Sequence, residues 1–260
     1  MGHNRIGRLP RTLRWRQVVS LLDEPSLDAS AVARASSLAA EVRLRRLAND
    51  PTLVHCFWIL TRLATAARQP DFANALAEIG IEARPDEPIL GFVARVAEQV
   101  RNEVAAHPES GHFATLASLA LRRALTETIG QHGRSLFGSS VDDLQAALRH
   151  YAGDVRFGRM ARLFFGDFFA ATLGSFVERE LSNRTGESPG LQTLRESQEF
   201  AQALDRYARE SALIMEEFAG GWYGKNNWES KGQINHEDTA GFVGYALRKL
   251  RTELTRSEQA

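Results

Sequence analysis

The chain has 260 residues, of which 43% are hydrophobic, and it carries 32 basic and 32 acidic side chains. This length and composition are typical of a folded protein with one large domain or two small ones. A formal net charge of zero argues against a protein that binds polyanions with its whole surface. The single cysteine, Cys56, excludes an intrachain disulfide and a cysteine-rich metal site.

Targeting and membrane signals are weak in this sequence. The first residues lack the apolar segment of a signal peptide. The longest apolar stretch, Leu163 to Val177, is shorter than a membrane span and contains Asp167. Nearly all basic residues are arginine, which is typical of a GC-rich genome. We therefore expect a bacterial protein of the reducing cytoplasm with no membrane partner.

The N-terminal residues are strongly basic. No acidic residue occurs before Asp23, and five arginines fall within the first sixteen residues: Arg5, Arg8, Arg11, Arg14 and Arg16. We expect residues 1–24 to form a basic arm that ends in a short helix. Guanidinium groups in such an arm can bind the phosphates of a nucleic acid or an acidic partner surface. The alternative is a tail that only improves solubility.

Apolar residues recur at helical spacing along most of the chain. The predicted helices cover, in order, 11–22, a segment capped by Ser26 or Asp28, 52–68, 70–79, 89–106, 113–129, a segment from the Ser140 cap to about 151, 157–181, 192–219 and 237–254. The segment 157–181 is apolar on nearly every face, which is typical of a helix buried by its neighbours. Small residues spaced for close helix approach accompany it: Gly158, Gly166, Ala170 and Gly174.

No segment shows convincing strand alternation between turn signals. The sequence thus predicts an all-α fold, with roughly eight to ten helices packed around a buried central helix at about 157–181. Residues 25–260 are expected to form this helical domain, with a candidate internal boundary near 130–140.

The segment 220–236 departs from the helical pattern. It contains Gly220-Gly221, several asparagines and two of the three lysines of the chain. We expect a helix to end at Gly220-Gly221 and a loop to follow. The residues of this loop that could bind a partner or a nucleic acid are Trp222, Tyr223, Lys225, Asn227, Trp228 and Lys231, because aromatic and basic side chains are common at such surfaces. The alternative is a structural loop held by its tryptophans.

Two further places hold titratable groups. Asp167 lies in a phenylalanine-rich stretch and must pair, protonate or face a cavity; we expect an ion pair with Arg162 or with an arginine of another helix. His236, Glu237 and Asp238 begin the last helix, where Asn235 is the expected cap and the acids favour the helix dipole. A site built from Asp167 and residues 236–238 is the alternative.

No nucleophile elbow, dinucleotide fingerprint, kinase motif or metal-binding helix occurs in the sequence, so no catalytic residue, metal or cofactor is predicted. The preferred hypothesis is a helical interaction subunit that works with other protein subunits. A nucleic-acid-binding module that uses the arginine arm and the Trp222–Lys231 segment is the first alternative. An enzyme with a site near Asp167 and His236–Asp238 is the second.

Overall fold

The computed structural model describes residues 13–41, 47, 50–106, 112–132 and 140–255. Within these ranges every regular element is helical, which confirms the all-α prediction. The elements are α1 (Leu13–Leu22), α2 (Ala29–Ala39), α4 (Pro51–Ala66), α5 (Phe72–Ala77), α6 (Ile89–Ala106), α7 (His112–Glu127), the short 3₁₀ helix η1 (Ile129–His132), α8 (Val141–His150), α9 (Asp154–Arg184), α10 (Leu194–Glu210), the 3₁₀ helix η2 (Ser211–Leu213), α11 (Ile214–Glu229) and α12 (His236–Thr255).

Short polar side chains fix where several of these helices begin. Each accepts hydrogen bonds from backbone N–H groups of the first turn, which have no partner inside the helix. The capping residues are Asp28 before α2, Asp50 before α4, Asp71 before α5, Ser140 before α8 and Thr193 before α10. The predicted caps Asp28 and Ser140 are therefore confirmed.

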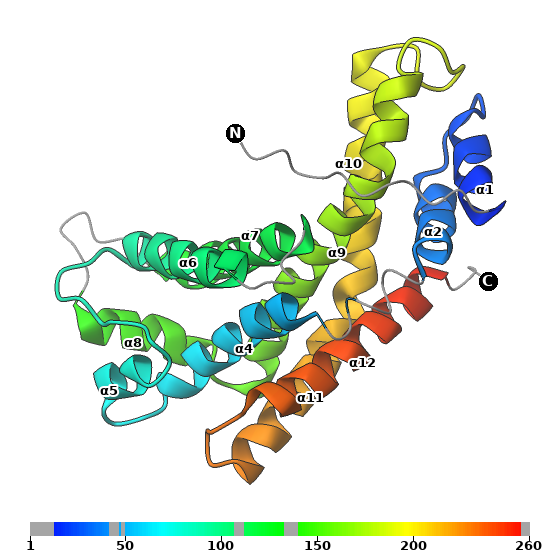
Figure 1. The fold of residues 1–260 in the computed structure, drawn as a ribbon. Helices are drawn as coiled ribbons and strands as arrows, with labels where there is room; N and C mark the ends of the chain where they lie inside the picture. Colours follow the sequence, from blue (N-terminus) through cyan, green and yellow to red (C-terminus); the bar gives the residue numbers. More distant parts are fainter. Residues whose placement is uncertain (1–12, 42–46, 48–49, 107–111, 133–139, 256–260) are drawn as a thin grey trace.

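Helix α9 is the predicted central helix, and it is longer than the apolar pattern indicated. It runs over 31 residues and packs against α7, α10 and α11. Its phenylalanines form the middle of a continuous core: Phe157, Phe164, Phe165, Phe168 and Phe169 are all fully buried. Figure 1 shows α9 running from the middle of the helical assembly to its upper end.

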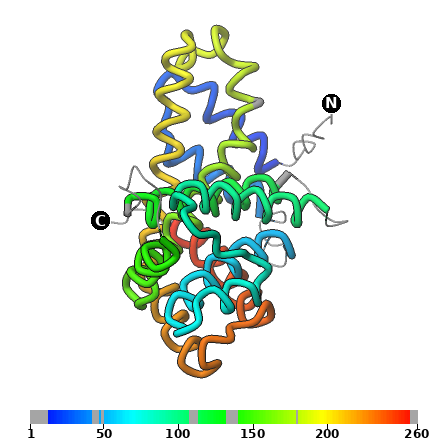
Figure 2. The backbone as a smooth tube through the Cα atoms, turned by 90° about the vertical axis from the view of Figure 1, so that its left-hand side faces the viewer, coloured from blue at the N-terminus to red at the C-terminus, as the bar shows by residue number. Residues whose placement is uncertain are grey.

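The other helices pack against different parts of α9. Helices α1, α2 and α10 lie along its C-terminal half, and α11 packs along its N-terminal half (Figures 1 and 2). Helix α7 crosses α9 near its middle, whereas α6 packs mainly on α7, and α12 mainly on α4 and α11. Helix α1 packs on α2 and buries Trp15, Val18 and Leu22. The candidate boundary near 130–140 falls largely on residues 133–139, which lie outside the described ranges.

The predicted ridge of small residues explains how closely α11 and the preceding η2 approach α9. A Cβ atom added to Gly158 would lie 2.0 Å from the carbonyl oxygen of Glu216, and one added to Gly166 would lie 3.3 Å from the Cβ of Ala212. A Cβ atom on Gly174 would meet nothing within 4 Å. The ridge is therefore a contact surface over its first part only.

By length and composition alone, α9 could cross a membrane, and no other helix in the described part of the chain passes that test. In the fold, 72% of its most apolar window of 18 residues is buried inside the protein. This burial is what a core helix of a soluble protein requires, because its apolar faces are covered by other helices.

Candidate functional site

Helix α11 occupies the segment that was predicted to be a loop, so that prediction was wrong. The predicted helix 192–219 instead breaks at η2, and α11 continues without interruption through Gly220 and Gly221 to Glu229. The physical reason is the packing on α9. A Cβ on Gly220 would lie 2.7 Å from the carbonyl oxygen of Asp154, and a Cβ on Gly224 would lie 2.4 Å from its carboxylate. These glycines permit close helix contact and do not terminate the helix.

The chain turns only after Glu229. Ser230 follows α11, and Lys231 and Gly232 both adopt the left-handed backbone region, with φ values of 52° and 87°. Gly232 suits this conformation, whereas a lysine adopts it at some conformational cost. The carbonyl oxygen of Gly232 accepts a hydrogen bond of 2.7 Å from the guanidinium of buried Arg62, which fixes the turn on α4.

The predicted binding residues of this segment separate onto different faces of α11. Tyr223 is fully buried and stacks on Phe157 with ring centroids 4.0 Å apart. Trp222 is half-buried and stacks on Phe242. Lys225 is exposed and lies 3.9 Å from Glu229. Tyr223 is therefore a core residue, and the prediction that it forms part of an exposed binding loop was wrong.

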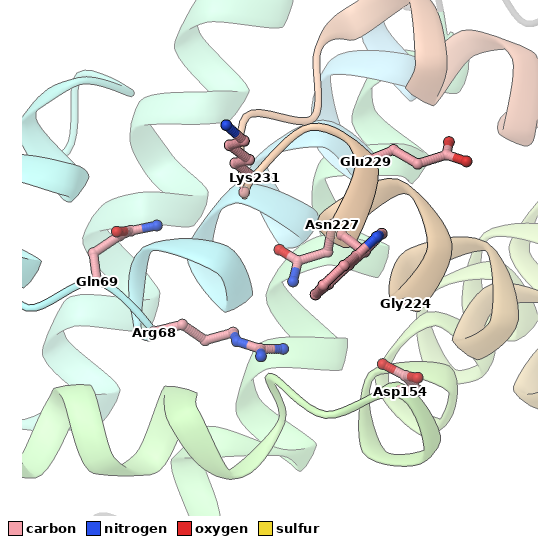
Figure 3. Close-up of a pocket in the computed structure, with 9 residues that line it drawn as sticks. Arg68, Gln69, Asp154, Gly224, Asn227, Glu229 and Lys231 are labelled. Atoms are coloured by element: carbon pink, nitrogen blue, oxygen red, sulfur yellow. The ribbon is translucent and has the colours of Figure 1, made fainter.

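The remaining predicted residues lie together at one pocket, shown in Figure 3. The pocket has a volume of about 750 Å³ and is lined by the end of α4, the start of α9 and the end of α11. Its lining residues are Arg68, Gln69, Asp154, Gly224, Asn227, Trp228, Glu229, Lys231 and Gly232. The side chain of Trp228 is 84% exposed, which is the highest exposure of any large hydrophobic residue in the described part of the chain.

The charges of this pocket are mixed. Arg68 donates a hydrogen bond of 3.2 Å to the carbonyl oxygen of Ala152, and neither Arg68 nor Lys231 forms an ion pair with another described residue. Asp154 and Glu229 place two carboxylates at the same pocket. The lining thus offers an aromatic face, two cations, two carboxylates and two amides. This combination is typical of a surface that binds another protein, and it contains no recognisable set of catalytic groups.

The buried hydroxyl of Tyr223 lies near the guanidinium of Arg68, which lines the pocket. Burial raises the pKa of this hydroxyl, and the nearby Arg68 opposes that shift. Tyr223 therefore stays protonated at neutral pH, and it belongs to the packed core, because it does not line the pocket.

The structure describes two arginines of the predicted basic arm, Arg14 and Arg16. Arg5, Arg8 and Arg11 lie outside the described residues. Arg14 has a structural partner, since its guanidinium lies 2.7 Å from the carboxylate of Glu41, which also pairs with Arg251 at 2.8 Å. Arg16 is exposed on α1. Binding of a nucleic acid by this arm stays a prediction.

Asp167 has the arginine partners that its buried position required, and they come from other helices. Its carboxylate is only 5% exposed and pairs with Arg209 of α10, and it also lies 3.4 Å from the Nε atom of Arg123 of α7. Arg209 in turn binds Asp205. The suggested partner Arg162 pairs instead with Glu216 at 3.0 Å. This network joins three helices and explains Asp167 without a ligand.

His236 belongs to a cluster that the sequence did not predict. Its Nε2 atom lies 3.3 Å from Nδ1 of His55, and Nε2 of His55 lies 3.0 Å from the carboxylate of Glu103. The His236 ring stacks on Trp58 with centroids 4.0 Å apart, and the Trp58 indole donates to the carbonyl oxygen of Ile234. Because His55 and His236 are 181 residues apart in the chain, spacing gave no signal for this pair.

The predicted cap of α12 is confirmed. The side-chain oxygen of Asn235 accepts a hydrogen bond of 2.8 Å from the backbone N–H of Asp238. Asp167 and His236 have separate partners, those of Asp167 on α7 and α10 and those of His236 on α4. No group of three histidine, cysteine or acidic side chains among the described residues is arranged to hold a metal ion.

The histidine cluster predicts a pH-dependent stability. Partial desolvation of the His236 ring, in a residue that is otherwise exposed, together with the nearby His55 lowers the pKa of His236 below its ordinary value. As pH falls, the unfolded chain therefore takes up this proton before the folded chain does, so stability is lost below about pH 6.5. Between about pH 7.5 and about pH 5.5, the melting temperature of the wild type should fall more steeply than that of His236→Gln in differential scanning fluorimetry. Parallel curves would contradict this prediction.

Comparison of the chain with protein-family models, with curated protein sequences and with solved structures gave no match.

Proposed function

We propose that this chain is a helical interaction subunit that docks a partner protein on the pocket at the end of α11. The observation that carries the proposal is the position of Trp228: a tryptophan that is 84% exposed stands at the wall of a pocket of about 750 Å³. Tryptophan is enriched among the residues that dominate binding energy at protein interfaces. A tryptophan buries a large apolar area when a partner covers it, and its contribution to the free energy of binding is correspondingly large.

The charges favour a protein partner over a nucleic acid. Arg68 and Lys231 could contact phosphates, but Asp154 and Glu229 line the same pocket and would repel them. A partner surface that carries both acidic and basic side chains around an apolar centre would complement this lining. The cytoplasm of a bacterium is the setting that we propose for such a complex.

The proposal predicts a loss of binding without a loss of folding for Trp228→Ala. Because Trp228 is exposed, its removal should change the free energy of unfolding by no more than about 0.5 kcal/mol. Removal of an interface anchor typically weakens binding by about 2 kcal/mol or more. We expect the proteins that co-purify with the tagged wild-type chain at native expression level to be lost from Trp228→Ala.

The matched control is Leu194→Ala, because Leu194 is 74% exposed at the start of α10, far along the chain from the pocket. This variant should retain every partner of the wild type. If Trp228→Ala retains the same partners in the same amounts, or if both variants lose them equally, docking at this pocket is wrong.

A further inference from the structure

A second pocket lies between α11 and α12 and is lined mainly by aromatic rings. It has a volume of about 480 Å³. Four aromatic side chains and two carboxylates form its main lining: Phe218, Trp222, Phe242, Tyr245, Glu237 and Asp238. The pocket at Trp228 is lined by other residues of α11, which helical spacing places on a different face of the helix.

The aromatic rings reach this pocket because of their spacing. Phe218 and Trp222 are four residues apart on α11, and Phe242 and Tyr245 are three residues apart on α12, so each pair shares one face of its helix. Trp222 and Phe242 stack with centroids 4.5 Å apart, and Phe218 meets Tyr245 edge-on at 5.5 Å. Phe218, Trp222 and Tyr245 are only half-buried, which leaves aromatic surface open to a ligand.

The charge of the lining is negative. Glu237 and Asp238, in the first turn of α12, contribute two carboxylates, while the ammonium group of Lys249 lies over two of the lining rings, Phe218 and Tyr245. Aromatic faces carry negative potential and attract cations, and carboxylates add to that attraction. The pocket at Trp228 differs, because Arg68 and Lys231 line it.

The chain already places an ammonium group on two of these rings. The Nζ atom of Lys249 lies 5.0 Å from the ring centroid of Phe218 and 5.5 Å from that of Tyr245. Both distances are within the range of a cation–π interaction, which extends to about 6 Å. These two rings therefore accept an ammonium group in the fold as it stands.

We propose that the pocket between α11 and α12 binds a small organic ammonium ion, with the cation against the aromatic rings and near the carboxylates of Glu237 and Asp238. The pocket is an open groove, and its volume of about 480 Å³ is sufficient for a small ammonium ion. Aromatic rings combined with acidic groups are a known means of recognising quaternary ammonium ligands. Lys249 is an intramolecular competitor for the rings of Phe218 and Tyr245.

The test uses choline as the probe and isothermal titration calorimetry on the full chain. The control ligand is 3,3-dimethyl-1-butanol, which has the shape of choline without its charge. We expect choline to bind and the neutral analogue to bind at least about tenfold more weakly. Equal binding of the two ligands would overturn the proposal, because shape alone would then explain it.

Three variants locate the site. The double variant Glu237→Gln/Asp238→Asn should weaken choline binding, whereas Glu98→Gln, an exposed residue of α6, should not. Lys249→Met should strengthen it, because the competing ammonium is removed. Absence of choline binding by both the wild type and Lys249→Met would overturn the proposal. Tighter binding of a trimethyllysine peptide than of choline would overturn the assignment to a small molecule.

Discussion

Replacement of Gly158 by alanine is expected to destabilise the protein by about 3 kcal/mol or more, because the new methyl group would lie 2.0 Å from the carbonyl oxygen of Glu216. Backbone atoms cannot move aside as a flexible side chain can, so α11 would have to shift away from α9. The gain of about 0.5–1 kcal/mol that alanine brings to a helix interior is much smaller. Urea unfolding followed by circular dichroism measures the difference.

The adjacent glycines of α11 give the sharpest control. Gly220→Ala should also destabilise, by about 1–3 kcal/mol, since its Cβ would lie 2.7 Å from the carbonyl oxygen of Asp154. Gly221→Ala should instead stabilise by up to about 1 kcal/mol, since a Cβ there meets nothing within 4 Å. If Gly221→Ala were strongly destabilising, this residue would adopt a left-handed conformation, and α11 would end where the sequence pattern suggested.

Removal of Arg209 is the second change with a large expected effect. Arg209→Met would leave the nearly buried carboxylate of Asp167 with only the more exposed Arg123, 3.4 Å away. Breaking a buried ion pair from one side typically costs about 3–5 kcal/mol, because the remaining charge stays desolvated. We expect a loss of about 3 kcal/mol in the free energy of unfolding from urea denaturation.

Two further variants distinguish the ion pair between Asp167 and Arg209 from the effect of removing any arginine near Asp167. Arg123→Met should cost no more than about 1 kcal/mol, because the side chain of Arg123 is 54% exposed and screened by water. The double variant Asp167→Leu/Arg209→Met should recover much of the stability, since no buried charge is then left unpaired. If the double variant were no more stable than Arg209→Met, the loss of stability in Arg209→Met would not come from the unpaired charge of Asp167.

Helix positions were predictable from the sequence wherever they depend on residues that are close together in the chain. Asp28 and Ser140 mark helix starts because capping depends on residues close in the chain. The Gly220-Gly221 pair was misread because a glycine that ends a helix and a glycine that admits a neighbouring helix are identical in sequence. Only the position of Asp154 on α9 distinguishes the two roles, and that contact joins distant parts of the chain.

The candidate site was predictable in part for the same reason. Asn227, Trp228 and Lys231 were selected from composition, and the pocket unites them. Arg68 and Asp154 complete it from other helices, and no local pattern identifies them. Because residues 220–229 were predicted to be a loop, the helical spacing of 3.6 residues per turn was not applied to them. This spacing is what places Tyr223 in the core and Trp228 on the surface.

The most direct test of the docking proposal is a photo-crosslink from position 229, which lines the same pocket and leaves Trp228 in place. A photoreactive amino acid is introduced at Glu229 in one variant and at Leu194, which is also exposed, in another. After irradiation of cells at native expression level, the account predicts a discrete crosslinked protein from position 229 and none from position 194. No adduct from position 229, or the same adducts from both positions, would contradict it.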